Sequence, residues 1–506
     1  MRSRIVLSCI ILAVCIVFAV VFALFILPEP PAPDTTEETT TLLAGEVEGY
    51  GGRVQMFDYV SAAEVASIYV HNSYGAYKLI NKGNSNLVIE GHEQILLDGE
   101  KLTQMIINAG YTISTFNANV NAEDFSKYGL AEGEARAYFV LTAQNGKRYT
   151  VYIGDETLAG DGYYARYEGR NAVYVLDDSI ERDILAPVEN LVNPLLAYPS
   201  PMNSYYLVSN FVIAHGDEVF LKADYLNPEQ RSELAAVSVH QLSVPGDYPA
   251  GENYDDVLAI FCNFKGSEVL SIDLSDENLE KYGLKNPAYQ LYFDNTLLDA
   301  NDRPTSLVSN LIHFSERQQD ESGRYFYYAV SYLFKIIARV EAINADFLSW
   351  ELDKWVSSSI FQVNIMNVES LTLSGKDVNA KFELSGKTND VLSVYERVNK
   401  VTPDITNFRQ LWKVLLSVTH DGAVTLDEKE ISDLVADESN LILEMKLVTR
   451  AGKERVWRFY PYSDRRVYYT VNGEGEFYLS NTLLYKAIAD ANRVIKGEKV
   501  DSDARY

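Results

Sequence analysis

Cysteine, histidine and positive charge are all scarce in this sequence. Three cysteines and six scattered histidines among 506 residues exclude a disulfide-stapled scaffold and an array of zinc fingers. Lysine and arginine total 44 against 71 aspartates and glutamates, so the formal net charge is −27. Such a field repels phosphate backbones, which excludes nucleic acid as a main partner. The 47% hydrophobic content nevertheless predicts a folded protein of about three domains.

Signatures of catalysis and of metal binding are also missing. Ser385-Gly386-Lys387-Thr388 resembles the end of a phosphate-binding loop, but Lys381 stands where the first glycine belongs. Asp294, Asp299 and Asp302 cluster in sequence without the spacing or the central glycine of a calcium loop. We therefore expect no enzymatic activity, no cofactor and no designed metal site.

The longest apolar run stands at the start of the chain. Residues 5–27 are uncharged and mostly aliphatic or aromatic, and as a helix these 23 residues are long enough to cross about 30 Å of hydrocarbon. Arg2 and Arg4 precede the run and four acidic residues follow it within 29–38, which holds the N-terminus in the cytoplasm. We predict a single-pass protein of the cell membrane, anchored through residues 5–27, with an extracytoplasmic C-terminal region. The alternative is a cleaved signal peptide, although its apolar core would be shorter.

Internal similarity indicates three repeated units behind this anchor. Asp124–Leu130 ends in Lys-Tyr-Gly-Leu and recurs as Asn278–Leu284, and a strand-like run follows both copies. A fainter third copy begins near Ile360 and lacks Tyr-Gly-Leu. We divide the chain into a cytoplasmic start with a transmembrane helix, an extended acidic linker, three repeat modules and a tail. These segments are residues 1–27, 28–58, 59–200, 201–358, 359–498 and 499–506.

Runs rich in β-forming residues dominate each module. Asn145-Gly146, Gly169 and Ala451-Gly452 each separate two such runs, which predicts three hairpins. Asp98 is placed to cap a helix, and helical periodicity recurs over 407–416 and 482–495. The sequence therefore predicts an α+β fold, in which an N-terminal transmembrane helix precedes tandem antiparallel-sheet modules with covering helices. Cys262, in Phe-Cys-Asn-Phe, is expected to be a buried and inert residue of a strand.

Tyrosine is abundant, with 35 residues that often lie in clusters on predicted strands. Alternate members of a strand face opposite sides of a sheet, so one set can enter the core while the other faces water. Exposed tyrosine rows suit contacts with proteins or glycans, whereas cross-strand packing in wide sheets explains them without a partner. The candidate interaction surface comprises Tyr163, Tyr164, Tyr325, Tyr327, Tyr328, Tyr468 and Tyr469.

The repeated motif also resembles a known family. Lys127–Leu130, Tyr152–Asp155 and the run 163–175 are similar to a bacterial membrane-anchored domain family of unknown function, whose members are often associated with gliding-motility-type ABC transport auxiliary proteins. The resemblance covers residues 65–200 well, 205–357 moderately and 360–496 faintly, and Lys281–Pro287 is its most specific fragment. It implies an envelope protein that works beside a transporter, and it implies no catalytic residues.

Together these features favour a binding role over an enzymatic one. We expect a single-pass, extracytoplasmic binding or scaffold protein that serves as an accessory subunit of an ABC-type transport system. Its expected partners are the membrane and an envelope or transporter protein. The alternative is a protein that binds cell-wall glycan through its tyrosine-rich sheet faces.

Overall fold

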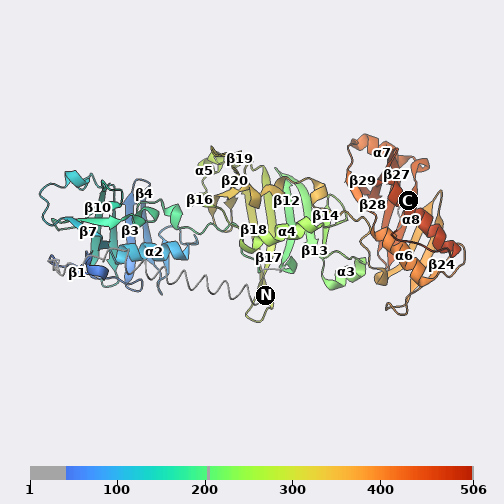
Figure 1. Ribbon diagram of the computed structural model, residues 1–506, viewed down its shortest axis with the longest axis horizontal. Helices are drawn as coiled ribbons and strands as arrows, with labels where there is room; N and C mark the ends of the chain where they lie inside the picture. Colours follow the sequence, from blue (N-terminus) through green and yellow to red (C-terminus); the bar gives the residue numbers. More distant parts are fainter. Residues whose placement is uncertain (1–41, 202–204, 504–506) are drawn as a thin grey trace, which may run out of the picture.

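The computed structural model describes residues 42–201 and 205–503, which form a mostly β structure (Figure 1). These residues contain four antiparallel sheets and seven α-helices. The predicted antiparallel-sheet modules are confirmed, but helices contribute less than an α+β class implies because most strands pair directly through hairpins. The predicted membrane helix at 5–27 lies outside the described residues. Among the helices within 42–201 and 205–503, none is long and apolar enough to cross a membrane.

The first large sheet has eight strands in the order β5-β4-β3-β8-β9-β10-β11-β7. Helix α2 (Gly99–Gly110) packs on it and begins as predicted, because the Asp98 side chain accepts hydrogen bonds from the backbone N–H groups of Glu100 and Lys101. The strands are β3 (Val65–Asn72), β4 (Gly75–Asn81), β5 (Leu87–Ile89), β7 (Phe116–Asn119), β8 (Ala137–Ala143), β9 (Arg148–Glu156), β10 (Gly162–Tyr167) and β11 (Val173–Asp177). A small sheet precedes and interleaves with them, formed by β1 (Val47–Glu48), β2 (Val54–Gln55) and β6 (Ile113–Ser114).

The second large sheet has ten strands. Nine follow the order β15-β14-β13-β12-β17-β18-β20-β21-β16, and β19 pairs with β20. The strands are β12 (Val208–His215), β13 (Glu218–Tyr225), β14 (His240–Val244), β15 (Tyr248–Pro249), β16 (Glu268–Ser271), β17 (Tyr289–Leu298), β18 (Pro304–Phe314), β19 (Gln318–Gln319), β20 (Tyr325–Ser331) and β21 (Ile336–Glu341). Its helices are α3 (Pro228–Leu234), α4 (Glu252–Ile260) and α5 (Asp276–Lys281).

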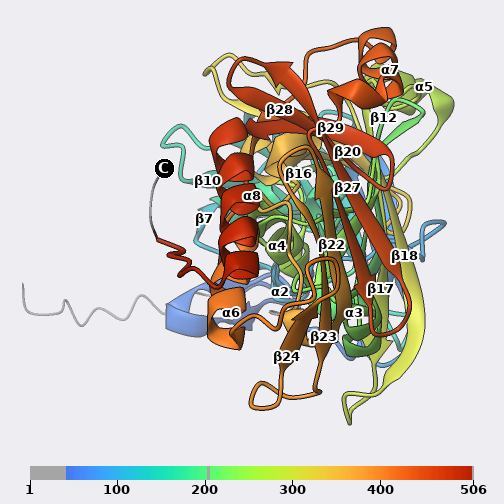
Figure 2. The ribbon, with the colours of Figure 1, turned by 90° about the vertical axis from the view of Figure 1, so that its right-hand side faces the viewer.

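The third large sheet has eight strands in the order β24-β23-β22-β26-β27-β28-β29-β25. Its helices α6 (Ile405–Leu416) and α8 (Asn481–Lys496) lie together on one side of the sheet, and α7 (Glu428–Ala436) lies apart from them (Figure 2). The periodic runs over 407–416 and 482–495 predicted α6 and α8. The strands are β22 (Val368–Gly375), β23 (Asn379–Ser385), β24 (Ser393–Glu396), β25 (His420–Ala423), β26 (Leu443–Thr449), β27 (Glu454–Ser463), β28 (Arg466–Val471) and β29 (Glu474–Ser480).

All three large sheets share one connection pattern. When the additional strands β15 and β19 are set aside, each sheet runs from one edge as its third, second, first, fifth, sixth, seventh and eighth strand in chain order. The fourth strand then closes the opposite edge. A helix (α2, α4 or α6) precedes that fourth strand in every case. The three sheets therefore repeat one topology, and they follow one another along the long axis of the molecule (Figure 1).

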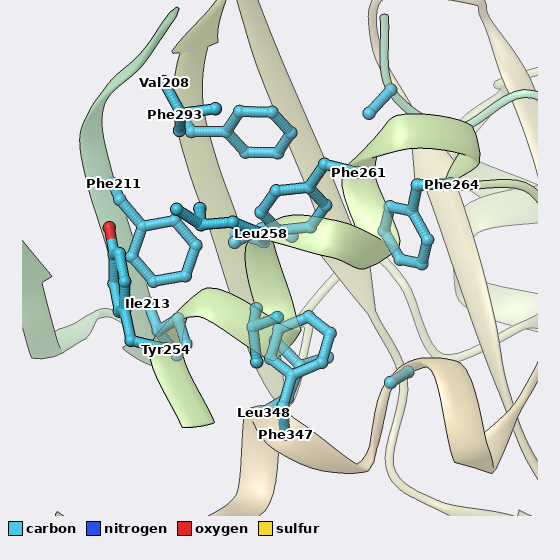
Figure 3. Packing of buried hydrophobic residues seen from close by; sticks show 14 of the residues in the cluster. Val208, Phe211, Ile213, Tyr254, Leu258, Phe261, Phe264, Phe293, Phe347 and Leu348 are labelled. Carbon is cyan, nitrogen blue, oxygen red and sulfur yellow. The ribbon is translucent and has the colours of Figure 1, made fainter. Parts of the chain in front are cut away.

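The main core lies between each sheet and its helix. In the second sheet, Tyr254 and Leu258 of α4 and Phe261 just after it point toward strands β12 and β17 (Figure 3). The rings of Phe261 and Phe293 stack with centroids 4.2 Å apart. Cys262 lies in a 3-10 turn, Phe261–Asn263, and is only half-buried. The strand predicted there is wrong, because Phe261 and Phe264 are spaced to turn inward from a helical end.

The Tyr-Gly-Leu segments, residues 128–130 and 282–284, form small separate cores. Leu130 packs with Val173 of β11, and Leu284 packs with Val330 of β20 and Ile337 of β21. Gly129 and Gly283 have φ angles of 65° and 69°, a left-handed conformation that glycine adopts without strain. The motif is thus conformational: glycine reverses the chain so that leucine is buried against the sheet.

Candidate functional site

The seven candidate tyrosines do not form one surface. Four of them are buried, with exposed fractions of 0–5%, namely Tyr163, Tyr327, Tyr468 and Tyr469. Tyr164 and Tyr328 are half-buried, and Tyr325 is 45% exposed. Both half-buried rings contact the tyrosine of a Tyr-Gly-Leu segment, at centroid distances of 5.0 and 5.1 Å. Only Tyr325 of this set offers a largely open ring, and the Arg317 guanidinium lies 4.1 Å from its centroid.

Three of the buried tyrosines form hydrogen bonds within the fold through their hydroxyl groups. Tyr163 donates a hydrogen bond to Glu181, and that bond together with burial raises the pKa of Tyr163 to about 12. Tyr327 donates to Asp346 at 3.1 Å, and burial raises its pKa above the usual value. Tyr468 donates to the Gly475 carbonyl at 3.0 Å, and burial likewise raises its pKa to about 12. These phenols stay neutral at physiological pH and serve as core hydrogen-bond donors.

The acidic run 294–302 is divided between two places. Asp294 is buried in β17 and accepts hydrogen bonds from Ser309, Tyr292 and Asn210. Although burial raises the pKa of Asp294, these three bonds together hold it below the usual value. Asp299 and Asp302 lie in the turn that follows, so the three carboxylates do not converge.

Two connecting segments join the sheets and are hydrogen-bonded on both sides. The first strap (residues 191–200) bonds to the first module through Leu191 and Asn193, then to the second through Leu196 and Ser200. For example, the Asp98 N–H donates to the Leu191 carbonyl at 2.8 Å, and the Leu196 N–H donates to the Phe264 carbonyl at 2.9 Å. The chain between the first and second sheets is therefore held in place by backbone pairing.

The second strap (residues 356–363) lies between the second and third sheets. It forms bridges with the second module at Val356–Ala250 and Val363–Ala236. Toward the third module, the indole N–H groups of Trp412 and Trp457 donate to strap carbonyls at 3.1 and 3.2 Å. His420 is also buried here, and its Nε2 lies within hydrogen-bond distance of the Ser357 carbonyl oxygen, at 3.1 Å.

An ion pair reinforces this junction. Arg455 of β27 donates to Asp247, at 2.7 Å from Nη2 and 3.0 Å from Nε. Gln241 and Asn472 also donate to Asp247, at 2.6 and 3.3 Å. The Arg455 side chain is 11% exposed, so the pair is shielded more than an ordinary surface ion pair. The second and third sheets are thus fixed to one another by side chains as well as by backbone.

A cleft of about 650 Å³ opens beside the second strap. We call it the junction cleft; one wall is the start of β14 with the start of α4, and the other is residues 353–362. Its charged side chains are Glu252, Asp255, Asp353 and Lys354. The remaining polar lining consists of Ser238, His240, Asn253, Ser357, Ser358, Ser359 and Gln362. This polar cavity lies where the second strap crosses the end of the second module.

The surroundings of Asp255 in the junction cleft shift the pKa of its carboxyl group. Its Oδ1 lies 3.3 Å from Nδ1 of His240, a side chain that is 2% exposed. Partial burial, and then the neighbouring charge of Asp256, raise the pKa of Asp255 above the usual value. A carboxylate in this setting is stabilised by any cation that approaches it.

The family comparison points to the first module. Residues 88–202 match the family model of a domain of unknown function, DUF4340. The match covers less than a quarter of the chain and runs from β5 through the first strap. No curated protein and no solved structure matches the chain. The resemblance to a domain of unknown function is therefore supported for one module, and it carries no functional residues with it.

The junction cleft was not predicted from the sequence. Its lining comes from residues 237–240, 250–255 and 353–362, which meet only when the second strap crosses the end of the second sheet. One local signal was present, because Ser357-Ser358-Ser359 is a polar run between two apolar segments. A serine run of this kind has the same composition as an ordinary linker, so it does not by itself indicate a cleft.

Proposed function

We propose that this chain is a single-pass, membrane-anchored extracytoplasmic binding or scaffold protein without catalytic activity, and that it serves an ABC-type transport system as an accessory subunit. The observation that carries the proposal is the repetition of one topology in three sheets, joined in a row by straps hydrogen-bonded on both sides. A row of this kind holds several surfaces at set distances from one another, as repeat proteins do when they bind extended partners. The apolar run at 5–27 would attach the row to the membrane.

Topology is the first point to test. External protease added to intact cells should digest the region 42–503 while a cytoplasmic marker protein survives. Replacement of residues 5–27 by a cleavable signal sequence should release the remainder from the membrane fraction. A region that is digested only after the cells are broken would contradict the extracytoplasmic placement.

Partner binding is the second point. Mild crosslinking followed by purification from membranes should recover a transporter subunit or another envelope protein with the full chain. A chain truncated after residue 41 retains the apolar run at 5–27 without any strand of the folded modules, so it is the matched control for non-specific membrane neighbours. Sedimentation with purified cell-wall polymer, without any crosslinked protein partner, would overturn the proposal in favour of glycan binding.

A further inference from the structure

The junction cleft has the size and the position of a ligand site. Its volume of about 650 Å³ lies within the range of small-molecule pockets, roughly 300–1,000 Å³, and it lies between the second module and the second strap. Both walls are held by backbone hydrogen bonds. The Gly251 N–H donates to the Trp355 carbonyl, and the Ser357 N–H donates to the Pro249 carbonyl, each at 2.8 Å. The opening is therefore pre-formed, and a ligand need not order it.

Charge determines which ligand the cleft suits. Three carboxylates face one ammonium group in the lining, and residues 201–358 as a whole carry 24 acidic against 11 basic side chains. Residues 359–506 are nearly balanced, with 22 acidic and 20 basic side chains. The acidic excess thus lies on the module that supplies most of the cleft, and it draws cations toward it.

The spacing of the carboxylates separates an organic cation from a metal ion. Among the described residues, no three His, Cys, Asp or Glu side chains come close enough to hold one metal ion. The serine hydroxyls and the Asn253 and Gln362 amides instead spread acceptors over the walls. Such a lining suits a donor group of several N–H bonds, as in guanidinium or a primary ammonium.

We infer that the junction cleft binds an arginine or lysine side chain presented by a partner protein. The inference rests on the proposed binding function, because it gives the chemistry of a partner segment at one place in the row. Asp255 and Asp353 accept hydrogen bonds from the cationic group, His240 orients Asp255, and Lys354 opposes binding by like charge.

Fluorescence anisotropy with a labelled Gly-Ser-Arg-Ser-Gly peptide tests this site on the full chain in a neutral detergent. The same peptide with citrulline in place of arginine keeps the shape and removes the charge. We expect the arginine peptide to bind at least about tenfold more tightly than the citrulline peptide. Asp353→Asn should weaken binding several-fold, Asp255→Asn combined with it should weaken binding about tenfold, and Lys354→Met should strengthen binding.

The matched control is Asp302→Asn with Glu321→Gln, which removes the same charge from exposed positions outside the cleft lining. This control should bind like the wild type. Equal weakening in the control and in the cleft variant would show a diffuse acidic field and overturn the inference, as would absence of binding by the wild type. Asp353 is exposed, so the single Asp353→Asn variant keeps the test decisive if the Asp255 variant does not fold.

Failure of this inference and failure of the proposed function have different signatures. Peptide binding in detergent needs neither the membrane nor a transporter. If the partner crosslink is intact but no peptide binds, the inference about the junction cleft is overturned and the proposed scaffold function stands. If the peptide binds but no envelope partner is recovered, the proposed scaffold function is overturned and the junction cleft remains a site for a cationic side chain.

Discussion

At the scale of single residues, Asp183 is a carboxylate held inside the first module. It is 2% exposed, and burial raises its pKa to about 6 although the Ile184 N–H and the Asn108 amide donate to it at 2.5 and 2.7 Å. An unfolded aspartate has a pKa near 3.8, so between about pH 4 and 6 the folded chain binds more protons than the unfolded chain. Stability contributed by Asp183 is therefore lost as the pH rises through that window.

The substitution Asp183→Asn removes this titration, so it tests whether stability falls as the pH rises. Two pKa units correspond to about 3 kcal/mol, so the wild type should lose about that much stability relative to the variant between pH 4 and 7, with no further change above pH 7. Thermal unfolding of both full-length chains across this range measures the difference. Glu132→Gln, at an exposed position, is the control and should track the wild type at every pH. A pH-independent difference for Asp183→Asn would show that the carboxyl group does not titrate there.

At the scale of elements, Gly154 of β9 lets the first Tyr-Gly-Leu segment lie against the sheet. A Cβ atom at Gly154 would overlap the Tyr128 carbonyl oxygen and lie 2.8 Å from Leu130 Cγ. Gly154→Ala should therefore lift the segment and destabilise the first module by about 1–3 kcal/mol, the usual cost of overpacking. The fall in melting temperature, together with loss of the Tyr128–Tyr164 ring contact in NMR spectra, checks this.

Gly99 provides the comparison for that substitution. It lies in the first turn of α2, and a Cβ atom there would meet no heavy atom within 4 Å. Gly99→Ala should leave stability unchanged or raise it by up to about 1 kcal/mol, because alanine favours the helix. Equal destabilisation by both alanines would indicate that Gly154 does not act through the segment.

Local signals predicted many elements, while tertiary contacts decided the rest. Asn145-Gly146 predicted the β8–β9 hairpin because glycine accepts the turn conformation, and its φ is 83°. Phe-Cys-Asn-Phe was misassigned because a short apolar run does not distinguish a strand from a helical end. Alternation showed that tyrosines divide between two faces, but it did not show which face would be covered. The junction cleft depends on contacts such as the Gly251 N–H with the Trp355 carbonyl, between segments about a hundred residues apart in the chain, which no local pattern records.

At the scale of the whole molecule, the Asp247–Arg455 pair should control how firmly the second and third sheets hold together. Arg455→Met keeps much of the side-chain volume but leaves Asp247 without its cation, at a cost of roughly 1–2 kcal/mol for a partly buried pair. We expect faster hydrogen exchange at the junction amides of Ile360 and His420, because their N–H groups pair the second strap with the third module through the Val418 and Ser358 carbonyls.

The matched control for that variant is Lys446→Met in the same sheet. Lys446 pairs with Glu454 at 2.9 Å, but both side chains are well exposed, so the loss should leave exchange at the junction unchanged. If the junction opens, small-angle scattering of the Arg455→Met chain should also show a broader pair-distance distribution with a larger maximum dimension than the wild type. Unchanged exchange in both variants would mean that the second strap alone holds the two sheets, because its backbone bonds would then suffice without the ion pair.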